Sequence, residues 1–261
     1  MVLFACLVMF GTASISTLVL PYRLAIVPLL VVAGTALVLY VLFELDKRHQ
    51  MAQLFHYRQI EALLSVHACL KVARPLPTLR GWAVSPDLAV VAIELIREHR
   101  PRCVVELGSG ASTVVSGYSL RANGSGQVYA LEHDQAFARE AARVLESHGL
   151  ADLARVLYAP LQPVAIGKQV YFWYAASVLD ELPFIDLLIV DGPPSAKGRP
   201  MVRYPALPLM FSKLRDGAFI LVDDFLRSDE TAIVARWLTE HEVEFVRSVP
   251  CEKGAAILRK A

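Results

Sequence analysis

Residues 103–112 read Cys-Val-Val-Glu-Leu-Gly-Ser-Gly-Ala-Ser, a short apolar run that ends at two closely spaced glycines. A run of this kind, bounded by turn residues, is typical of a buried strand, and a helix is expected from about Ser112. Gly108 and Gly110 would let the backbone approach a ligand closely, and the start of the helix would offer free amides. A tight strand-to-helix turn without any ligand would explain the same residues.

Apolar runs and amphipathic stretches alternate on both sides of this turn. Strands are predicted over 103–107, 127–132, 154–158, 185–190 and 218–222, helices over 85–99, from 112, 135–148, 204–214 and 230–241, and a closing hairpin over 243–249 and 255–258. Alternating strands and helices favour a parallel sheet that binds ligands at the carboxyl ends of its strands. We therefore expect an α/β, Rossmann-like doubly wound fold, with a mostly parallel seven-stranded sheet and a C-terminal antiparallel hairpin.

The N-terminal residues carry most of the excess apolar content of this 261-residue, 55% hydrophobic chain. Two runs, Val2–Leu20 and Leu24–Leu45, each have about the 20 residues that a helix needs to cross a membrane, and Pro21-Tyr22-Arg23 separates them. The sequence therefore predicts an N-terminal transmembrane helical hairpin. The alternatives are a single span or a cleaved leader, although no Lys or Arg precedes the first run as a leader would require.

Positive residues indicate the orientation of this hairpin. Lys47, Arg48 and Arg58 follow the second run, whereas the connecting turn holds only Arg23. Because Lys and Arg favour the cytoplasmic side, we expect an inner-membrane protein whose catalytic part faces the cytosol. The predicted organisation is two transmembrane helices over 1–46, a helical linker over 47–80 that lies on the membrane or on the domain, and a Rossmann-like domain over 81–261.

Charge and cysteine content exclude some classes of site. With 26 Lys and Arg against 25 Asp and Glu, the net charge is +1, and no basic block stands out, so no nucleic-acid partner is expected. The four cysteines are far apart and form no CxxC pair, which indicates neither a zinc site nor a disulfide framework. Nothing in the sequence indicates the oligomeric state.

Carboxylates follow three of the predicted strands. Glu132 lies about 24 residues after Gly108, at a place where a carboxylate can accept hydrogen bonds from both ribose hydroxyls of a nucleoside. Asp134 is a candidate for the start of the next helix. Asp191 ends the fourth strand and Asp223-Asp224 the fifth.

These last three carboxylates are expected to converge on one edge of the sheet. Like charges placed together need a cation, a proton or intervening water, and oxygen ligands suit Mg²⁺ or another divalent cation. Asp191, Asp223 and Asp224 are therefore candidate metal ligands. Alternatively, Asp191 acts alone as a base, or Asp224 caps the turn at 227–228.

Five stretches in this order and spacing, VVELGSGASTV, YALEHD, IDLLIVDGPP, RYPALPL and GAFILVDDF, resemble class I S-adenosylmethionine-dependent methyltransferases. They are most similar to the bacterial branch with ELGSG.ST, EHD and VDGPP motifs, and the resemblance covers roughly residues 53–261. It implies S-adenosylmethionine as the cofactor. The implied cofactor-binding residues are Glu106, Gly108, Ser109 and Gly110 for the methionine end, Glu132 for the ribose, His133 near the adenine and Asp191 near the methyl group, and Ser112 is a further cofactor-binding candidate.

The resemblance bears on the acidic cluster as well. In catechol-type O-methyltransferases, acids after the fourth and fifth strands bind a divalent ion, and Asp191, Asp223 and Asp224 match those positions. The chain departs from the family pattern because Gly-Pro-Pro follows Asp191. It also departs at 159–161, where Ala-Pro-Leu replaces the usual acidic residue after the third strand.

The expected function is O-methylation of a small-molecule, lipid-linked or glycan acceptor at the cytosolic membrane face. Asp191 is the expected catalytic base, with Asp223 or Asp224 as helper. One alternative is an NAD-dependent oxidoreductase, although Thr113 stands where the third glycine of GxGxxG would be. Another is a non-catalytic membrane scaffold that retains the fold.

Aromatic and basic residues leave further alternatives open. Residues 171–174 (Tyr-Phe-Trp-Tyr) and Trp82 would form a lid or stacking wall for an acceptor, or would simply pack an extension onto the domain. Arg199 and Arg203 would receive an anionic substrate, or would be solvated loop charges.

Overall fold

The structure is a computed structural model that describes residues 2–194 and 199–261, with side chains from Pro28 onward. Contacts divide the chain into two compact units, Met1–His56 and Tyr57–Ala261. The first unit belongs entirely to helix α1 (Val2–Cys69), which continues into the second unit.

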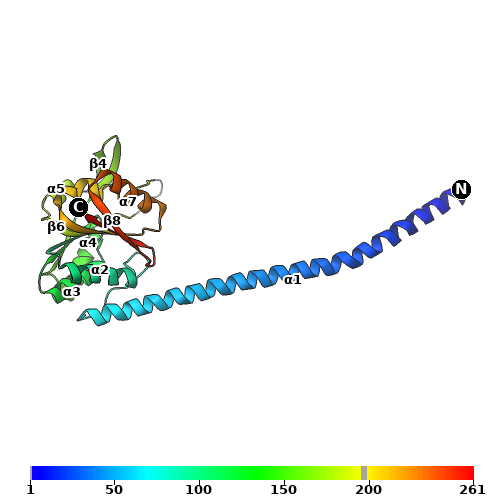
Figure 1. The fold of residues 1–261 in the computed structure, drawn as a ribbon, viewed down its shortest axis with the longest axis horizontal. Coiled ribbons are helices and arrows are strands. Elements are labelled where there is room, and N and C mark those ends of the chain that lie inside the picture. Colours follow the sequence, from blue (N-terminus) through cyan, green and yellow to red (C-terminus); the bar gives the residue numbers. More distant parts are fainter. Residues whose placement is uncertain (1, 195–198) are drawn as a thin grey trace. The chain divides into compact units, whose positions relative to one another are not determined.

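Helix α1 runs without a break through the position of the expected hairpin turn (Figure 1). The predicted reversal at Pro21-Tyr22-Arg23 is therefore wrong. A single proline removes one amide donor and can kink a helix, but a reversal needs several residues that leave the helical conformation. Within the described residues from Pro28 on, this helix contains one candidate membrane span, with a mean hydropathy of 2.1 and none of its window buried.

The second unit is built around a seven-stranded sheet in the order β3-β2-β1-β6-β7-β9-β8. Its pairs are parallel from β3 to β7, whereas β9 runs antiparallel to both of its neighbours, which confirms the predicted fold. The strands are β1 (Cys103–Leu107), β2 (Gln127–Glu132), β3 (Ala154–Tyr158), β6 (Ile185–Val190), β7 (Leu214–Asp223), β8 (Val243–Val249) and β9 (Ala255–Lys260).

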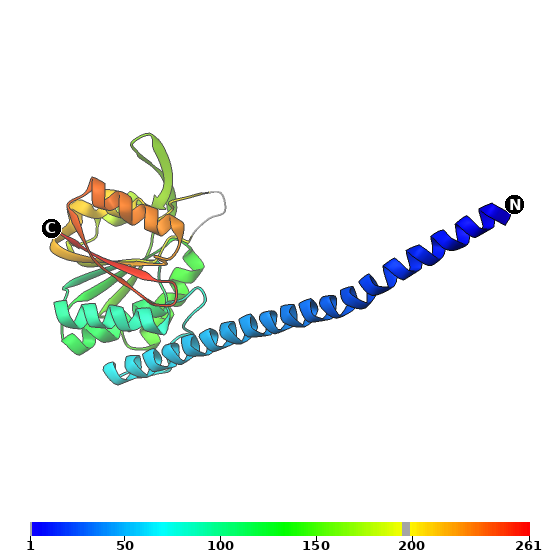
Figure 2. The same cartoon turned by 45° about the vertical axis from the view of Figure 1, so that its right-hand side comes forward.

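Helices cover both faces of this sheet (Figures 1 and 2). One face carries α2 (Pro86–His99), α3 (Ala111–Asn123) and α4 (Gln135–Ser147), and the other carries α5 (Ala176–Asp180), α6 (Ala206–Met210), the short helix η1 (Phe211–Lys213) and α7 (Ser228–Glu240). Side chains alternate along β1, so Val104 packs in one core and Val105 in the other. Both faces of the central strands are therefore buried, and the strand ends remain available for a site.

Two segments differ from the sequence prediction. A two-stranded hairpin, β4 (Leu161–Ile166) with β5 (Gln169–Tyr174), was not predicted, because Pro163 argues against a strand and only an isolated edge tolerates it. The predicted helix 204–214 ends earlier, and Leu214 already pairs with Ile185 at the start of β7. The pairing of β6 with β7 shifts register between Ile185 and Leu187. This irregularity accommodates residues 215–217 of β7, which lie between the predicted helix and the predicted strand.

The junction between α3 and β2 depends on Gly126, which has φ +103°. A Cβ there would lie 2.6 Å from the carbonyl oxygen of Pro101 and 2.9 Å from Leu120 Cδ2. We expect Gly126→Ala to lower the free energy of unfolding by about 3 kcal/mol, from backbone strain plus the clash. Chemical denaturation of the full chain in detergent micelles measures this loss.

Gly124 supplies the matched control. It also has positive φ (+78°), but a Cβ there would meet nothing within 4 Å. Gly124→Ala should therefore cost only about 1 kcal/mol, the strain of the left-handed conformation. Equal losses in the two variants would contradict the steric account of Gly126.

Candidate active site

A cleft of about 1270 Å³ opens at the carboxyl ends of β1, β2, β6 and β7. Among the predicted site residues, it is lined by Gly108, Ser109, Glu132, His133, Asp191 and Asp224. The other predicted site residues, Glu106, Gly110, Ser112 and Asp223, do not line it. The positions of the lining residues follow from the parallel topology, which brings the ends of the central strands to one edge.

Glu132, at the end of β2, is held in place by the turn after β1. Its Oε2 accepts hydrogen bonds from the amide of Ser109 (3.2 Å) and from the Ser109 hydroxyl (3.0 Å). Its Oε1 accepts from the amide of Asp134 (3.0 Å) and lies 2.9 Å from His133 Nδ1. The carboxylate is therefore oriented by the backbone on both sides, at the mouth of the glycine turn.

Asp134 has the structural role that the sequence suggested. Its side chain accepts hydrogen bonds from the amides of Ala136 (2.7 Å) and Phe137 (3.0 Å) and so caps the start of α4. This leaves Glu132 as the carboxylate of the EHD stretch that is oriented toward Ser109.

Glu106 lies behind the glycine turn and is fully buried. Its Oε2 accepts a hydrogen bond from the Thr113 hydroxyl (2.6 Å), which in turn accepts one from the amide of Gly110 (3.1 Å). Its Oε1 has no hydrogen-bond partner among the described residues. Burial raises the pKa of this carboxyl to about 7, against the opposing hydrogen bonds from Ser112 and Thr113. Glu106 thus supports the turn from inside the domain.

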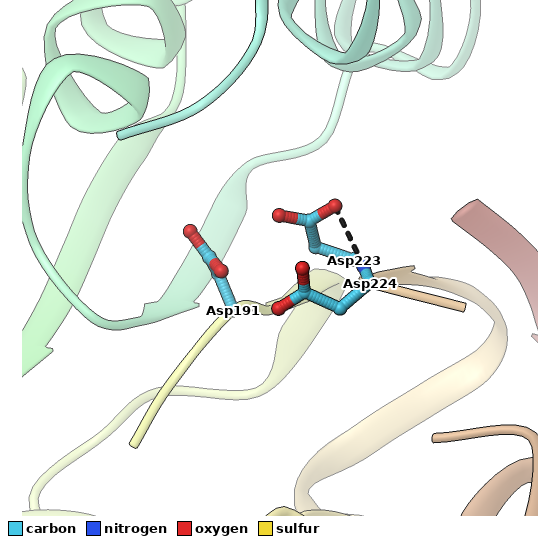
Figure 3. A group of neighbouring side chains, drawn as sticks. All are labelled: Asp191, Asp223 and Asp224. Atoms are coloured by element: carbon cyan, nitrogen blue, oxygen red, sulfur yellow. Dashed lines mark hydrogen bonds between the residues drawn. The ribbon is translucent and has the colours of Figure 1, made fainter. Parts of the chain in front are cut away.

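Three aspartates meet at the ends of β6 and β7. Asp191, Asp223 and Asp224 each offer an oxygen within 4.8 Å of the others. Figure 3 shows Asp191 on one strand end and the two neighbouring aspartates on the next, with the Asp223 carboxylate accepting a hydrogen bond from the amide of Asp224 (2.7 Å). Asp224 has φ +61°, an uncommon conformation for a residue with a side chain.

The pKa values of this cluster reflect its burial. Burial, followed by the charges of Asp191 and Asp224, raises the pKa of Asp223 to about 8. Burial also raises the pKa of Asp191, opposed by the guanidinium of Arg203 and reinforced by Asp224.

Arg203 is the main partner of these acids and is only 4% exposed. Its Nη2 lies 2.9 Å from Asp224 Oδ2 and 3.5 Å from Asp191 Oδ1, and its Nη1 lies 3.6 Å from Glu230 Oε1. Sequence reasoning left open whether Arg203 was a solvated loop charge, and that alternative is wrong. The feature of the sequence that could have indicated this buried role is that Arg203 begins the RYPALPL stretch, which belongs to the family resemblance.

Two further cations approach the same cluster. Arg227 Nη1 lies 2.9 Å from Asp224 Oδ2, and Lys253 Nζ lies 3.9 Å from Asp224 Oδ1. Three cations therefore already compensate the acids, and the arrangement gives no support to the divalent cation that the sequence allowed.

The aromatic residues divide into two groups. Tyr171, Trp173 and Tyr174 are buried, so they pack the extension onto the domain. Tyr174 also lines the cleft, and its hydroxyl has no hydrogen-bond partner among the described residues. Trp82 is 90% exposed and lines the cleft, as does Phe137 on the first turn of α4. Sequence reasoning did not single out Phe137, because its position is that of an ordinary helix residue.

The raised pKa of Glu106 predicts a dependence of stability on pH. Because the pKa of Glu106 is raised in the folded state, its contribution to the free energy of unfolding is fully present below the ordinary pKa of 4.5. This contribution is lost as the pH rises through about 7. At about 1.4 kcal/mol per unit, the loss is about 3 kcal/mol. We expect Glu106→Gln to flatten the fall in unfolding free energy between pH 5 and pH 8, measured by chemical denaturation.

Asp223, whose pKa is raised to about 8, also lowers the free energy of unfolding as the pH rises. Part of the pH dependence should therefore remain in Glu106→Gln. The control is Glu140→Gln on the exposed side of α4, which should keep the full slope. An unchanged slope in Glu106→Gln would contradict this account.

Comparisons with known proteins agree with this architecture. Residues 105–225 match the family model described as a methyltransferase domain. No sequence among curated proteins matches the chain.

Solved structures resemble the chain at low sequence identity. The S-adenosylhomocysteine-bound methyltransferase PaMTH1 of Podospora anserina is 14% identical, with a TM-score of 0.55 over 78% of this chain and 87% of that one. An O-methyltransferase from Bacillus cereus in complex with S-adenosylhomocysteine is 17% identical, with a TM-score of 0.53 over 78% and 90%. TomG of Streptomyces achromogenes, an O-methyltransferase of tomaymycin synthesis in complex with S-adenosylmethionine, is 18% identical, with a TM-score of 0.52 over 70% and 83%.

The matched domain, the strand order and the cleft agree with one another. Residues 105–225 therefore match a methyltransferase domain, and the second unit has the fold of the solved methyltransferases named above.

Proposed function

We propose that the chain transfers the methyl group of S-adenosylmethionine to a hydroxyl oxygen of a small-molecule, lipid-linked or glycan acceptor at the cytosolic face of the inner membrane. The observation that carries this proposal is the carboxylate of Glu132, fixed beside the glycine turn of β1 at the edge of a large cleft. The O-methyltransferases of similar fold support oxygen as the methylated atom.

The residues present fit a nucleoside cofactor. Gly108 has φ +98°, so the backbone turns there in a conformation that favours glycine and leaves the strand end open. The cleft volume of about 1270 Å³ exceeds the usual 300–1,000 Å³ of a small-molecule site, which leaves room for an acceptor beside the cofactor. Gly108 and Ser109 would hold the methionine end, with Glu106, Gly110 and Ser112 supporting the turn.

Glu132 would bind the ribose and His133 would lie near the adenine. Both oxygens of Glu132 already accept hydrogen bonds, from Ser109 and Asp134 and from the His133 ring in its donor form. We infer that ribose hydroxyls replace the two side-chain donors, the Ser109 hydroxyl and the His133 imidazole, while both backbone amides stay in place. The pre-oriented carboxylate would then bind the diol without rearrangement of the backbone.

Bound S-adenosylmethionine supplies an activated methyl group on a sulfonium, a good leaving group. The chain aligns the acceptor oxygen with that methyl group and excludes water. Asp191 takes the proton of the acceptor hydroxyl, because it lies in the cleft and its pKa is raised by burial toward the range of a useful base. Asp223 and Asp224 set the charge around Asp191 and keep Arg203 in place.

The apolar part of α1 would anchor this domain to the membrane. The residues after Pro28 combine high hydropathy with side chains that are not buried, which suits a lipid environment. Lys47, Arg48 and Arg58 follow the apolar part and would lie at the cytosolic surface. The catalytic domain would then meet acceptors at that surface.

Binding of S-adenosylhomocysteine tests the core of the proposal. The full chain should bind it, and Glu132→Gln should weaken binding by about tenfold to a hundredfold, because a neutral amide replaces a charged acceptor of hydrogen bonds. Isothermal titration calorimetry measures both affinities. Glu140→Gln, on the exposed side of α4, is the control and should bind normally. No binding by the unaltered chain would end the proposal.

A C-terminal reporter tests the orientation. Fused after Ala261, a reporter that is active only in the cytosol should be active, and one that needs export should be silent. Replacing Lys47, Arg48 and Arg58 by Gln should reduce this asymmetry, because these charges retain the following segment on the cytosolic side. Activity of the exported reporter on the unaltered chain would contradict a cytosolic catalytic domain.

A further inference from the structure

The cleft has two halves that lie on different strands. Glu132 and Ser109 belong to the ends of β2 and β1, whereas Asp224 belongs to the end of β7. In the order β2-β1-β6-β7, three strand spacings of about 4.8 Å separate β2 from β7, or about 14 Å. Because the proposed cofactor half lies at β1 and β2, the half beyond Asp191 is left for the acceptor.

Trp82 lines the cleft from a turn that is anchored near this acceptor half. It sits in a turn closed by hydrogen bonds from the Arg80 amide to the Val84 carbonyl (3.0 Å) and from the Ala83 amide to the Arg80 carbonyl (3.2 Å). The Arg80 guanidinium forms a two-pronged ion pair with Glu252, at 3.0–3.3 Å. Glu252 precedes Lys253, which lines the cleft and approaches Asp224. The turn is therefore anchored on the side of β7 and β9.

A large apolar side chain held in the open on such an anchored turn is unusual. Of the three tryptophans, Trp173 and Trp237 are fully buried, whereas Trp82 is exposed at the cleft. The ring presents a flat face with a negative quadrupole, which attracts C–H groups that carry partial positive charge. It therefore offers a stacking surface for a ring.

The polar groups of this half require a ligand that can donate hydrogen bonds. Asp224 Oδ1 and Glu230 Oε2 are buried and have no hydrogen-bond partner among the described residues, although Lys253 Nζ lies 3.9 Å from Asp224 Oδ1, and both side chains line the cleft. Arg203 and Lys253 line the same half as donors. A buried oxygen without a donor is unfavourable, so a ligand that donates a hydrogen bond to it gains affinity.

Acceptors and donors together select among ligand classes. An anionic ligand only accepts hydrogen bonds and would face the carboxylates, and an ammonium ligand only donates and would face the buried Arg203. Hydroxyl groups both donate and accept without net charge. We propose that the methyl acceptor is a neutral, hydroxyl-rich ring, a sugar residue, that stacks on Trp82 and donates hydroxyl hydrogens to Asp224 and Glu230. This proposal rests on the proposed function and narrows its acceptor class.

The test uses the full chain loaded with S-adenosylhomocysteine in a polyoxyethylene detergent, because maltoside detergents themselves present sugars. Methyl glycosides of glucose, mannose and rhamnose are titrated by calorimetry. At least one should bind, and Trp82→Ala should weaken it by about tenfold or more. Trp82→Phe, which keeps an aromatic face, should restore most of the affinity.

Two controls separate this result from other effects. The affinity for S-adenosylhomocysteine should not change in Trp82→Ala, and Phe184→Ala, another exposed aromatic position outside the cleft, should bind the glycosides normally. With labelled S-adenosylmethionine, the bound glycoside should be methylated, and Asp191→Asn should abolish the transfer.

Three outcomes would overturn the sugar proposal while leaving the proposed function intact. The first is that the loaded chain binds none of the glycosides. The second is that tyramine or 4-hydroxybenzoate, an ammonium and an anionic probe, binds more tightly than every glycoside. The third is that Trp82→Ala weakens the cofactor product instead, which would place Trp82 over the adenine. Failure of the unaltered chain to bind S-adenosylhomocysteine would be a failure of the proposed function itself.

Discussion

The guanidinium of Arg203 lies between carboxylates from the ends of β6 and β7 and from α7, and the shape of the catalytic edge depends on it. Asp191, Asp224 and Glu230 all lie within 3.6 Å of its nitrogens. Removing one partner of such a buried network of charged groups typically costs about 3–5 kcal/mol. Arg203 also donates toward the carbonyls of Pro193 and Asp223, so it connects side chains and backbone.

This network also bears on the chemistry. A methyltransferase that used a divalent cation would need carboxylates free to coordinate it, whereas here Arg203, Arg227 and Lys253 occupy that role. Burial and the neighbouring charges act on the pKa of Asp191, which burial raises, and this suits the base proposed above. In the same network, one oxygen each of Asp224 and Glu230 is buried and has no hydrogen-bond partner among the described residues, and the acceptor proposal uses these two side chains.

Much of the fold could be predicted because the central strands are buried on both faces. The predicted limits of β1, β2 and β6 agree with the structure, since such strands read as continuous apolar runs, and those of the edge strand β3 agree as well. The β4–β5 hairpin was missed because it packs along an edge, where Pro163 and alternating polar residues obscure the pattern. The N-terminal hairpin was predicted from the length of apolar runs alone, and length does not determine whether a helix reverses at a proline.

The sequence by itself determined the order of strands and helices, the glycine turn after β1 and the carboxylates at the strand ends. These features are local: hydrophobic periodicity and turn chemistry fix them within a few residues of each motif. Only the tertiary structure decided that Arg203 is buried among the acids, that Glu106 lies behind the turn, and that Trp82 and Lys253 line the same cleft. Arg203 is 12 to 27 positions from its acidic partners and Trp82 is 171 positions from Lys253, and no pattern along the chain records which of these residues meet in space.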